Sequence, residues 1–144
     1  MAETNGLTGW EVKELVYTWF RKLVIKAPEE EMLALLSAES LEMRFPEETL
    51  RNHTDFKQWY KKVTHLFFDQ VHELKMLDVD IRGDQATVHL IVNWQARTWN
   101  PPAGFSEWRG FNVHQKWIVV QDPKSGKPVI SVYHVGEFDP MQQS

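Results

Sequence analysis

The pattern that most restricts the fold is a strict alternation of side-chain character along residues 86–97. Every second residue there is small or apolar, and the residues between them are mostly polar. The small and apolar set is Ala86, Val88, Leu90, Val92, Trp94 and Ala96. Because successive side chains of a strand point to opposite faces of a sheet, the alternation predicts a β-strand with one buried face. Other elements must cover that face.

Three further segments have strand character, and turn-forming sequences separate them. They cover residues 76–81, 108–121 and 129–138. The intervening segments contain glycine, which tolerates positive φ angles, and proline, which fixes φ. We therefore expect an antiparallel meander in the second half of the chain. A short additional strand is expected at residues 41–46, where apolar and polar residues alternate up to a proline.

Helical periodicity marks the first half of the chain. Residues 10–25 place apolar side chains on one helical face, and Thr8 and Glu11 match a capping box at its start. Pro28 and the three glutamates after it predict a second, short helix. A third helix is expected from residue 54 or 55 to about residue 74. Helices followed by a meander predict an α+β domain with the helices packed on one face of the sheet.

Length and composition bound the domain organisation and the partners. The 144 residues, 42% of them hydrophobic, predict one domain over residues 1–144 with a core at about residues 10–138. The net charge is -4 and basic and acidic residues are interleaved, so no nucleic-acid partner is expected. The absence of cysteine excludes disulfides and thiolate zinc sites. A polar N-terminus and the lack of a long apolar run predict a cytoplasmic protein with no membrane partner.

The order of elements and two short motifs carry a family resemblance. The motifs are LLSAESLEMRFP at residues 35–46 and GKPVISV at residues 126–132. Over about residues 10–138 the chain resembles the nuclear transport factor 2-like (NTF2-like, or cystatin-like) superfamily, which includes SnoaL-like polyketide cyclases and ketosteroid isomerases. The resemblance implies a cone-shaped, strongly curved, mixed or antiparallel sheet with three N-terminal helices on its concave face. It also implies a pocket for a hydrophobic small molecule and a homodimer.

The resembled isomerases differ from this chain at their catalytic positions. Their general base is an aspartate just before the proline that ends the first strand, whereas this chain has Phe45 before Pro46. Their first-helix tyrosine corresponds to Trp19, whose indole N–H donates a hydrogen bond but takes no part in proton transfer. Their second oxyanion-hole acid corresponds to Gln115, which keeps hydrogen-bonding ability without acidity. The isomerase mechanism as such is therefore not expected here.

Two polar residues on predicted inward strand faces are candidates for catalysis. His134 shares a face with Ile130 and Val132, and the resemblance places that face on the pocket wall. A histidine there either acts as a general acid or base near neutral pH or is a structural imidazole with buried partners. Gln115 stands among apolar residues of its own strand face, where it either orients a ligand or satisfies a neighbouring amide.

Seven further residues are expected to contact a ligand. They are Trp19, Arg44, Phe45, Trp59, Trp94, Trp117 and Val132. The tryptophans fall on predicted inward faces, where large rings suit a flat apolar ligand. Arg44 either holds a carboxylate or pyrophosphate-like group or points outward. A loop carrying Trp99, Phe105 and Trp108 is expected to cover the mouth of the pocket.

No metal and no cofactor are expected. His65, Asp69 and His72 share a face of the predicted third helix, but that face lies opposite the apolar one. A metal bound there would lack the dry surroundings that such sites use. We therefore interpret these three residues as a solvated surface.

Two function hypotheses follow. The first is a SnoaL-like enzyme, a cofactor-independent lyase, isomerase, cyclase or dehydratase that acts on a hydrophobic, ring-bearing metabolite by acid–base chemistry. The second is a non-catalytic small-molecule-binding or dimerisation module of the same fold. The missing aspartate before Pro46 favours the second, and His134 with Gln115 favours the first. A homodimer is expected to form through the outer face of the sheet around Ile91, where apolar and polar residues are mixed.

Overall fold

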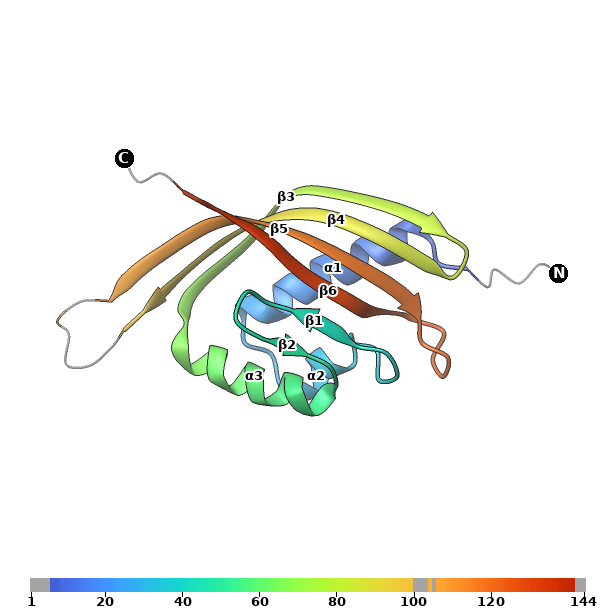
Figure 1. Ribbon diagram of the computed structural model, residues 1–144, viewed down its shortest axis with the longest axis horizontal. Helices are drawn as coiled ribbons and strands as arrows, with labels where there is room; N and C mark the ends of the chain where they lie inside the picture. Colours follow the sequence, from blue (N-terminus) through green and yellow to red (C-terminus); the bar gives the residue numbers. More distant parts are fainter. Residues whose placement is uncertain (1–5, 100–103, 105, 142–144) are drawn as a thin grey trace.

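The computed structural model describes residues 6–99, 104 and 106–141. In these residues three helices lie on one side of a six-stranded sheet with the order β2-β1-β6-β5-β4-β3 (Figure 1). The elements are α1 (Gly9–Val24), α2 (Glu29–Leu33), β1 (Glu42–Arg44), β2 (Thr49–Leu50), α3 (His53–Leu66), β3 (Phe68–Arg82), β4 (Gln85–Thr98), β5 (Glu107–Gln121) and β6 (Pro128–Pro140). The predicted α+β fold class is confirmed.

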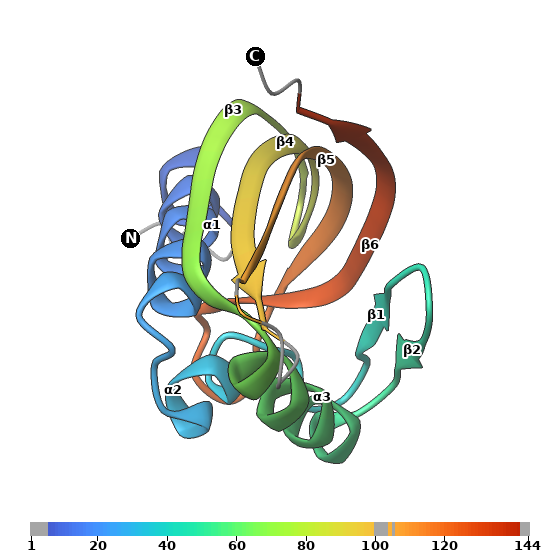
Figure 2. The same cartoon turned by 90° about the vertical axis from the view of Figure 1, so that its left-hand side faces the viewer.

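The four long strands form the antiparallel meander that the sequence predicts. Strands β3 to β6 pair in chain order, and the short strand β1 adds to β6 in the parallel direction, so the sheet is mixed. Figure 2 shows that the long strands bend strongly and that the sheet curls without closing. Its concave side faces the helices, while β2 and β3 form its two edges.

Helix α1 closes the concave face from one side. Thr8 Oγ1 accepts a hydrogen bond from the backbone N–H of Glu11 at 3.1 Å, which confirms the predicted N-cap. The buried face of α1 packs into one core with the inward side chains of the sheet. The largest fully buried side chains of that core include Trp19, Phe56, Met43, Leu90 and Trp117. Of the helices that the structure describes, none is long and apolar enough to cross a lipid bilayer.

The third helix is shorter than predicted. Helix α3 ends at Leu66, and Phe67 already has extended backbone angles of φ −108° and ψ 143°. Asp69 adopts a positive φ of 51°, and the chain continues as the 15-residue strand β3. The expected helix up to residue 74 is therefore wrong, and His72 belongs to a strand. The solvated helical face proposed for His65, Asp69 and His72 does not exist.

Strand β6 contains two bulges that shift its side chains from one face to the other. Val119 pairs with Ile130 and Ile118 pairs with Val132, so Ser131 is an additional residue without a directly opposite partner. A second register shift lies further along β6, before Phe138. Each bulge adds one residue, and one added residue reverses the inward and outward assignment of all residues beyond it.

The bulges decide which residues of β6 face the helices. Beyond the first bulge, Tyr133 and Val135 lie on the concave side, and beyond the second bulge Phe138 does so too. Val132 and His134 lie on the outer side. The predicted inward placement of Val132 and His134 is therefore wrong, because it assumed unbroken alternation from Ile130 onward.

Candidate functional site

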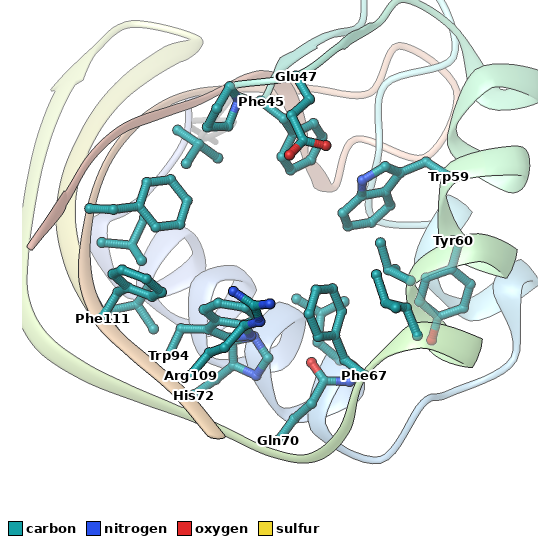
Figure 3. A pocket seen from close by; sticks show the side chains of 18 of the residues that line it. Phe45, Glu47, Trp59, Tyr60, Phe67, Gln70, His72, Trp94, Arg109 and Phe111 are labelled. Carbon is teal, nitrogen blue, oxygen red and sulfur yellow. The ribbon is translucent and has the colours of Figure 1, made fainter. Parts of the chain in front are cut away.

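A cavity of about 620 Å³ lies between the concave face of the sheet, helix α3 and the turn after β1 (Figure 3). Its volume lies within the range of about 300–1,000 Å³ that is common for small-molecule sites. Aromatic rings form much of its wall, and they come from α1, α3, β4 and β5, from the turn after β1 and from the residue that follows α3. These rings include Phe20, Phe45, Trp59, Phe67, Trp94 and Phe111.

The rings are held in pairs around the hollow. Phe45 stacks on Trp59, with ring centroids 4.6 Å apart and an interplanar angle of 20°. Trp94 stacks with Phe111 at 6.1 Å and meets Phe67 edge-on at 5.2 Å. Figure 3 shows these two groups on different sides of the open space. Flat apolar surfaces on separate walls suit a flat apolar ligand between them.

A buried hydrogen-bond network borders the cavity beneath these rings. Trp19 Nε1 donates to Tyr133 Oη at 3.3 Å, and Trp117 Nε1 donates to Gln115 Oε1 at 2.9 Å. Burial raises the pKa of Tyr133 to about 12, although hydrogen bonds from Trp19 and Gln115 act in the opposite direction. Tyr133 is therefore a neutral phenol at physiological pH, with Gln115 beside it on the cavity wall.

His72 is the second polar group of the cavity interior. Its ring stacks on Phe20 at 5.6 Å, and its Nδ1 atom is buried without a hydrogen-bond partner. Burial lowers the pKa of His72 to about 4, because water no longer stabilises the protonated form. At neutral pH the ring is uncharged, with one nitrogen that donates and one that accepts. Thr98 Oγ1, also on the wall, is buried without a partner as well.

Charged side chains stand at the opening of the cavity. Figure 3 shows the guanidinium of Arg109 and the carboxylate of Glu47 directed toward the hollow. Arg109 has a distant ion pair with Glu107 at 3.7 Å, and Lys62 pairs with Glu48 at 2.6 Å. The opening thus offers charges of both signs to a ligand whose body lies among the rings.

Solved structures with the same arrangement identify the fold. A provisionally named dehydratase of the NTF2-like family from Streptomyces avermitilis superposes with a TM-score of 0.73 at 14% identity, covering 93% of this chain and 96% of that one. A provisionally named scytalone dehydratase from Novosphingobium aromaticivorans reaches a TM-score of 0.75 at 13% identity, covering 94% and 93%. The chain has the NTF2-like fold. A cystatin-like protein of unknown function from Nostoc punctiforme, 16% identical, covers 94% of this chain and 96% of its own with a TM-score of 0.71.

The resemblance seen in the sequence is thereby confirmed at the level of the fold. No protein-family model and no curated protein matches the sequence itself. The structures compared are 11–16% identical to this chain. Similarity at that level shows the architecture of the chain, and its chemistry has to be argued from its own residues.

Within this NTF2-like fold, six of the nine candidate residues lie at or directly beneath the cavity. Phe45, Trp59, Trp94 and Gln115 line it. Trp19 and Trp117 are fully buried behind the wall. They contact it through hydrogen bonds to Tyr133 and Gln115 and through ring contacts with Tyr133.

The remaining three candidates lie outside the cavity. His134 Nε2 is 2.7 Å from Glu42 Oε2 on the outer side, and Val132 shares that side. The side chain of Arg44 is 58% exposed and lies 3.5 Å from the same carboxylate. The hydrogen bond from His134, together with the charges of Arg44 and Arg51, lowers the pKa of Glu42. This group is a surface ion-pair network.

The aromatic loop near the mouth also differs from expectation. Trp108 Nε1 donates to Gln95 Oε1 at 3.3 Å, and the indole lies against Gly110, where an added Cβ would meet the ring at 2.4 Å. Trp108 therefore covers the outer face of the sheet. Trp99 is 51% exposed, and Phe105 lies outside the described residues.

Among residues 6–99, 104 and 106–141, one group of three side chains has metal-ligand chemistry at suitable spacing. It consists of His114, Glu137 and Asp139 on the outer face. His114 Nε2 already lies 2.8 Å from Asp139 Oδ2, and the two side chains are 42% and 56% exposed. This group is separate from the cavity.

Sequence reasoning missed several cavity residues that a signal could have revealed. Arg109 and Phe111 continue the inward face of β5 that Gln115 and Trp117 define, so the same alternation extended to the start of the strand predicts them. Tyr133 carried no signal, because only the bulge at Ser131 brings it inward.

Proposed function

We propose that this protein binds a flat, mainly apolar small molecule with two or more rings inside the cavity. The observation that carries the proposal is the pairing of ring walls on different sides of one open hollow, with a few polar groups set among them. Ligand sites commonly combine such a predominantly apolar lining with a few polar groups that fix orientation. Phe45, Trp59 and Trp94 supply the contact surfaces.

A second candidate function is cofactor-independent acid–base catalysis, of the lyase, isomerase, cyclase or dehydratase type. His72 favours it, because an uncharged imidazole in an apolar cavity can accept a proton from a bound substrate. Its low pKa makes it a weak base in the empty cavity. A negative charge that develops on a bound substrate would raise that pKa, so proton transfer would be coupled to binding. The dehydratase names of similarly folded proteins are consistent with this chemistry.

The roles proposed for the sequence-derived candidates change accordingly. Gln115 keeps its role in orienting a ligand, since it lies on the cavity wall. His134, paired with Glu42 on the outer side, is replaced by His72 as the candidate acid or base. Assembly as a homodimer through the outer face, and a cytoplasmic location, stay predictions.

Binding is tested with a panel of fused-ring compounds, using calorimetry and tryptophan emission. Val135→Phe should fill the cavity from β6 and weaken binding by at least about tenfold, which corresponds to 1.4 kcal/mol. Val132→Phe, three residues earlier on the same strand, places the same added ring on the outer side and should leave binding unchanged. Panel members that bind both variants equally well would show that the cavity is not their site. A panel without any binder would contradict the proposed function.

A further inference from the structure

The hydrogen-bond network at the closed end of the cavity has a fixed direction. An indole N–H can only donate, so Trp117 assigns the oxygen of the Gln115 side chain as the acceptor at 2.9 Å. The amide nitrogen of Gln115 is then left to donate. Gln115 lowers the pKa of Tyr133, which is the effect of a donor close to the phenol oxygen.

A second indole directs a hydrogen bond to the same hydroxyl. Trp19 Nε1 donates to Tyr133 Oη at 3.3 Å. The oxygen of Tyr133 thus accepts a hydrogen bond from Trp19, and the ring is held by its stack on Trp117 at 4.9 Å. Within the part of the chain that the structure describes, no acceptor receives the hydroxyl proton of Tyr133. Tyr133 is only 4% exposed, so bulk water is remote from that proton.

A buried donor without an acceptor is costly, typically about 1–3 kcal/mol, and native structures leave few of them. Because Tyr133 and Gln115 are both part of the cavity wall, an acceptor can reach the hydroxyl from within the cavity. We propose that Tyr133 donates this hydrogen bond to an acceptor oxygen of the bound ligand, a carbonyl or a phenolate at one end of a ring system. This rests on the proposed binding function and narrows it to oxygenated ring compounds.

Three neighbours act through Tyr133 as positioning residues. Trp19 and Gln115 fix the hydroxyl, and Trp117 fixes Gln115. Hydrogen bonds that run in one direction polarise one another, so the final O–H is a stronger donor than an isolated phenol. The hydroxyl stays protonated at physiological pH, because burial raises the pKa of Tyr133 to about 12. Tyr133 is therefore a recognition group, and no proton leaves it.

Tyr60 provides a matched control on the same cavity. It also lines the wall, but its hydroxyl donates to the backbone oxygen of Ala27 at 2.6 Å. Its proton is already used within the protein. Tyr60→Phe therefore removes a hydroxyl from the cavity lining without removing a donor that a ligand could use.

The experiment compares two probes of the same shape. Acetylnaphthalene carries a carbonyl, and isopropenylnaphthalene replaces that oxygen with a methylene group at the same ring position. Calorimetry is run with the wild type, Tyr133→Phe and Tyr60→Phe. We expect Tyr133→Phe to weaken the ketone about tenfold and the hydrocarbon less than about twofold. Tyr60→Phe should affect both probes equally.

A spectroscopic measurement on the wild type covers the case in which Tyr133→Phe fails to fold. The carbonyl stretch of isotope-labelled acetylnaphthalene should shift to lower frequency on binding, as expected for an oxygen that accepts a hydrogen bond. A bound ketone whose band stays at its value in an apolar solvent overturns the inference. If both probes bind and Tyr133→Phe weakens them equally, the inference fails and the proposed binding function stands. If neither probe binds, both proposals fail.

Discussion

The concave and outer faces of the sheet hold their histidines in opposite ways. On the concave face, His72 is uncharged, stacked on Phe20, and has a ring nitrogen without a partner. On the outer face, His134 lies 2.7 Å from the carboxylate of Glu42, and both side chains are about one third exposed. The inner histidine is left open to a ligand, whereas the outer one is occupied by the protein. Burial without a partner therefore distinguishes His72 from His134, which the residue type alone does not.

The bulge at Ser131 determines which residues of β6 lie on each face. Its removal should have the largest effect on the free energy of unfolding. Deleting Ser131 would turn Val132 and His134 toward the core and Tyr133 outward, in a strand that pairs with both β5 and β1. We expect a loss of more than about 4 kcal/mol in the free energy of unfolding, because a core face is replaced by a mixed one. Urea denaturation followed by circular dichroism measures it.

A deletion of Lys124, in the exposed turn between β5 and β6, is the matched control. It shortens the same hairpin without changing the face assignment of β6, and it should cost much less. Equal losses from the two deletions would show that the bulge does not decide the faces.

The next largest effect should be the pH dependence that His72 gives to the free energy of unfolding. Its pKa is lowered from 6.5 to about 4 in the folded protein, so between those values the unfolded chain binds a proton that the folded chain excludes. The contribution of His72 to the free energy of unfolding is fully present above pH 6.5. It is lost as the pH drops toward 4, by about 3 kcal/mol in total. His72→Phe keeps the stack on Phe20 and should remove this dependence. The measurement is urea denaturation at a series of pH values.

His89→Gln is the control for that series. His89 is exposed on the outer side of β4, so its replacement should leave the pH dependence as in the wild type. A wild-type curve that stays flat between about pH 7 and pH 4 would mean that water or a counter-charge reaches His72.

Regular strands could be predicted from the sequence, and irregular positions could not. Residues of β4 and β5 pair without interruption from Gln85 to Thr98, so alternation alone assigned Trp94 and Gln115 to the cavity side. A bulge leaves no mark in the alternation, which is why His134 was assigned to the wrong side. The end of α3 was hidden because apolar residues near Phe67 continue the helical spacing for another turn.

The outer face offers the third comparison, between a ligand site and a subunit interface. Asn93 donates to Asn112 of the neighbouring strand at 3.0 Å, and Gln95 donates to Asn93 along the same strand at 2.9 Å, so these polar side chains satisfy one another. Such a face can be covered by a second copy at little desolvation cost. We expect a homodimer in which Ile91→Lys raises the dissociation constant by about ten- to thirtyfold, or about 1.4–2 kcal/mol.

Analytical ultracentrifugation across a concentration series measures that constant. Gln85→Lys, at the exposed start of β4, is the control, because it adds the same charge on the same side of the strand as Ile91 but away from the centre of the outer face. A wild type that sediments as a 17.0 kDa monomer throughout the micromolar range would contradict the prediction.

The smallest effect is expected from the outer pair of His134 and Glu42, because water screens an exposed pair. The hydrogen bond from His134 lowers the pKa of Glu42 below 4.5, so its contribution is present above that pH and is lost as the pH falls through the lowered value. Glu42→Gln should therefore reduce the unfolding midpoint slightly at neutral pH and leave it unchanged in strong acid. The loss from His72 begins near pH 6.5 and the loss from Glu42 begins only near pH 4.5, so one descending pH series distinguishes their onsets. Calorimetry with His134→Gln should give a ligand affinity within about twofold of the wild type. A selective loss of ligand binding in this variant would show that His134 contacts the ligand.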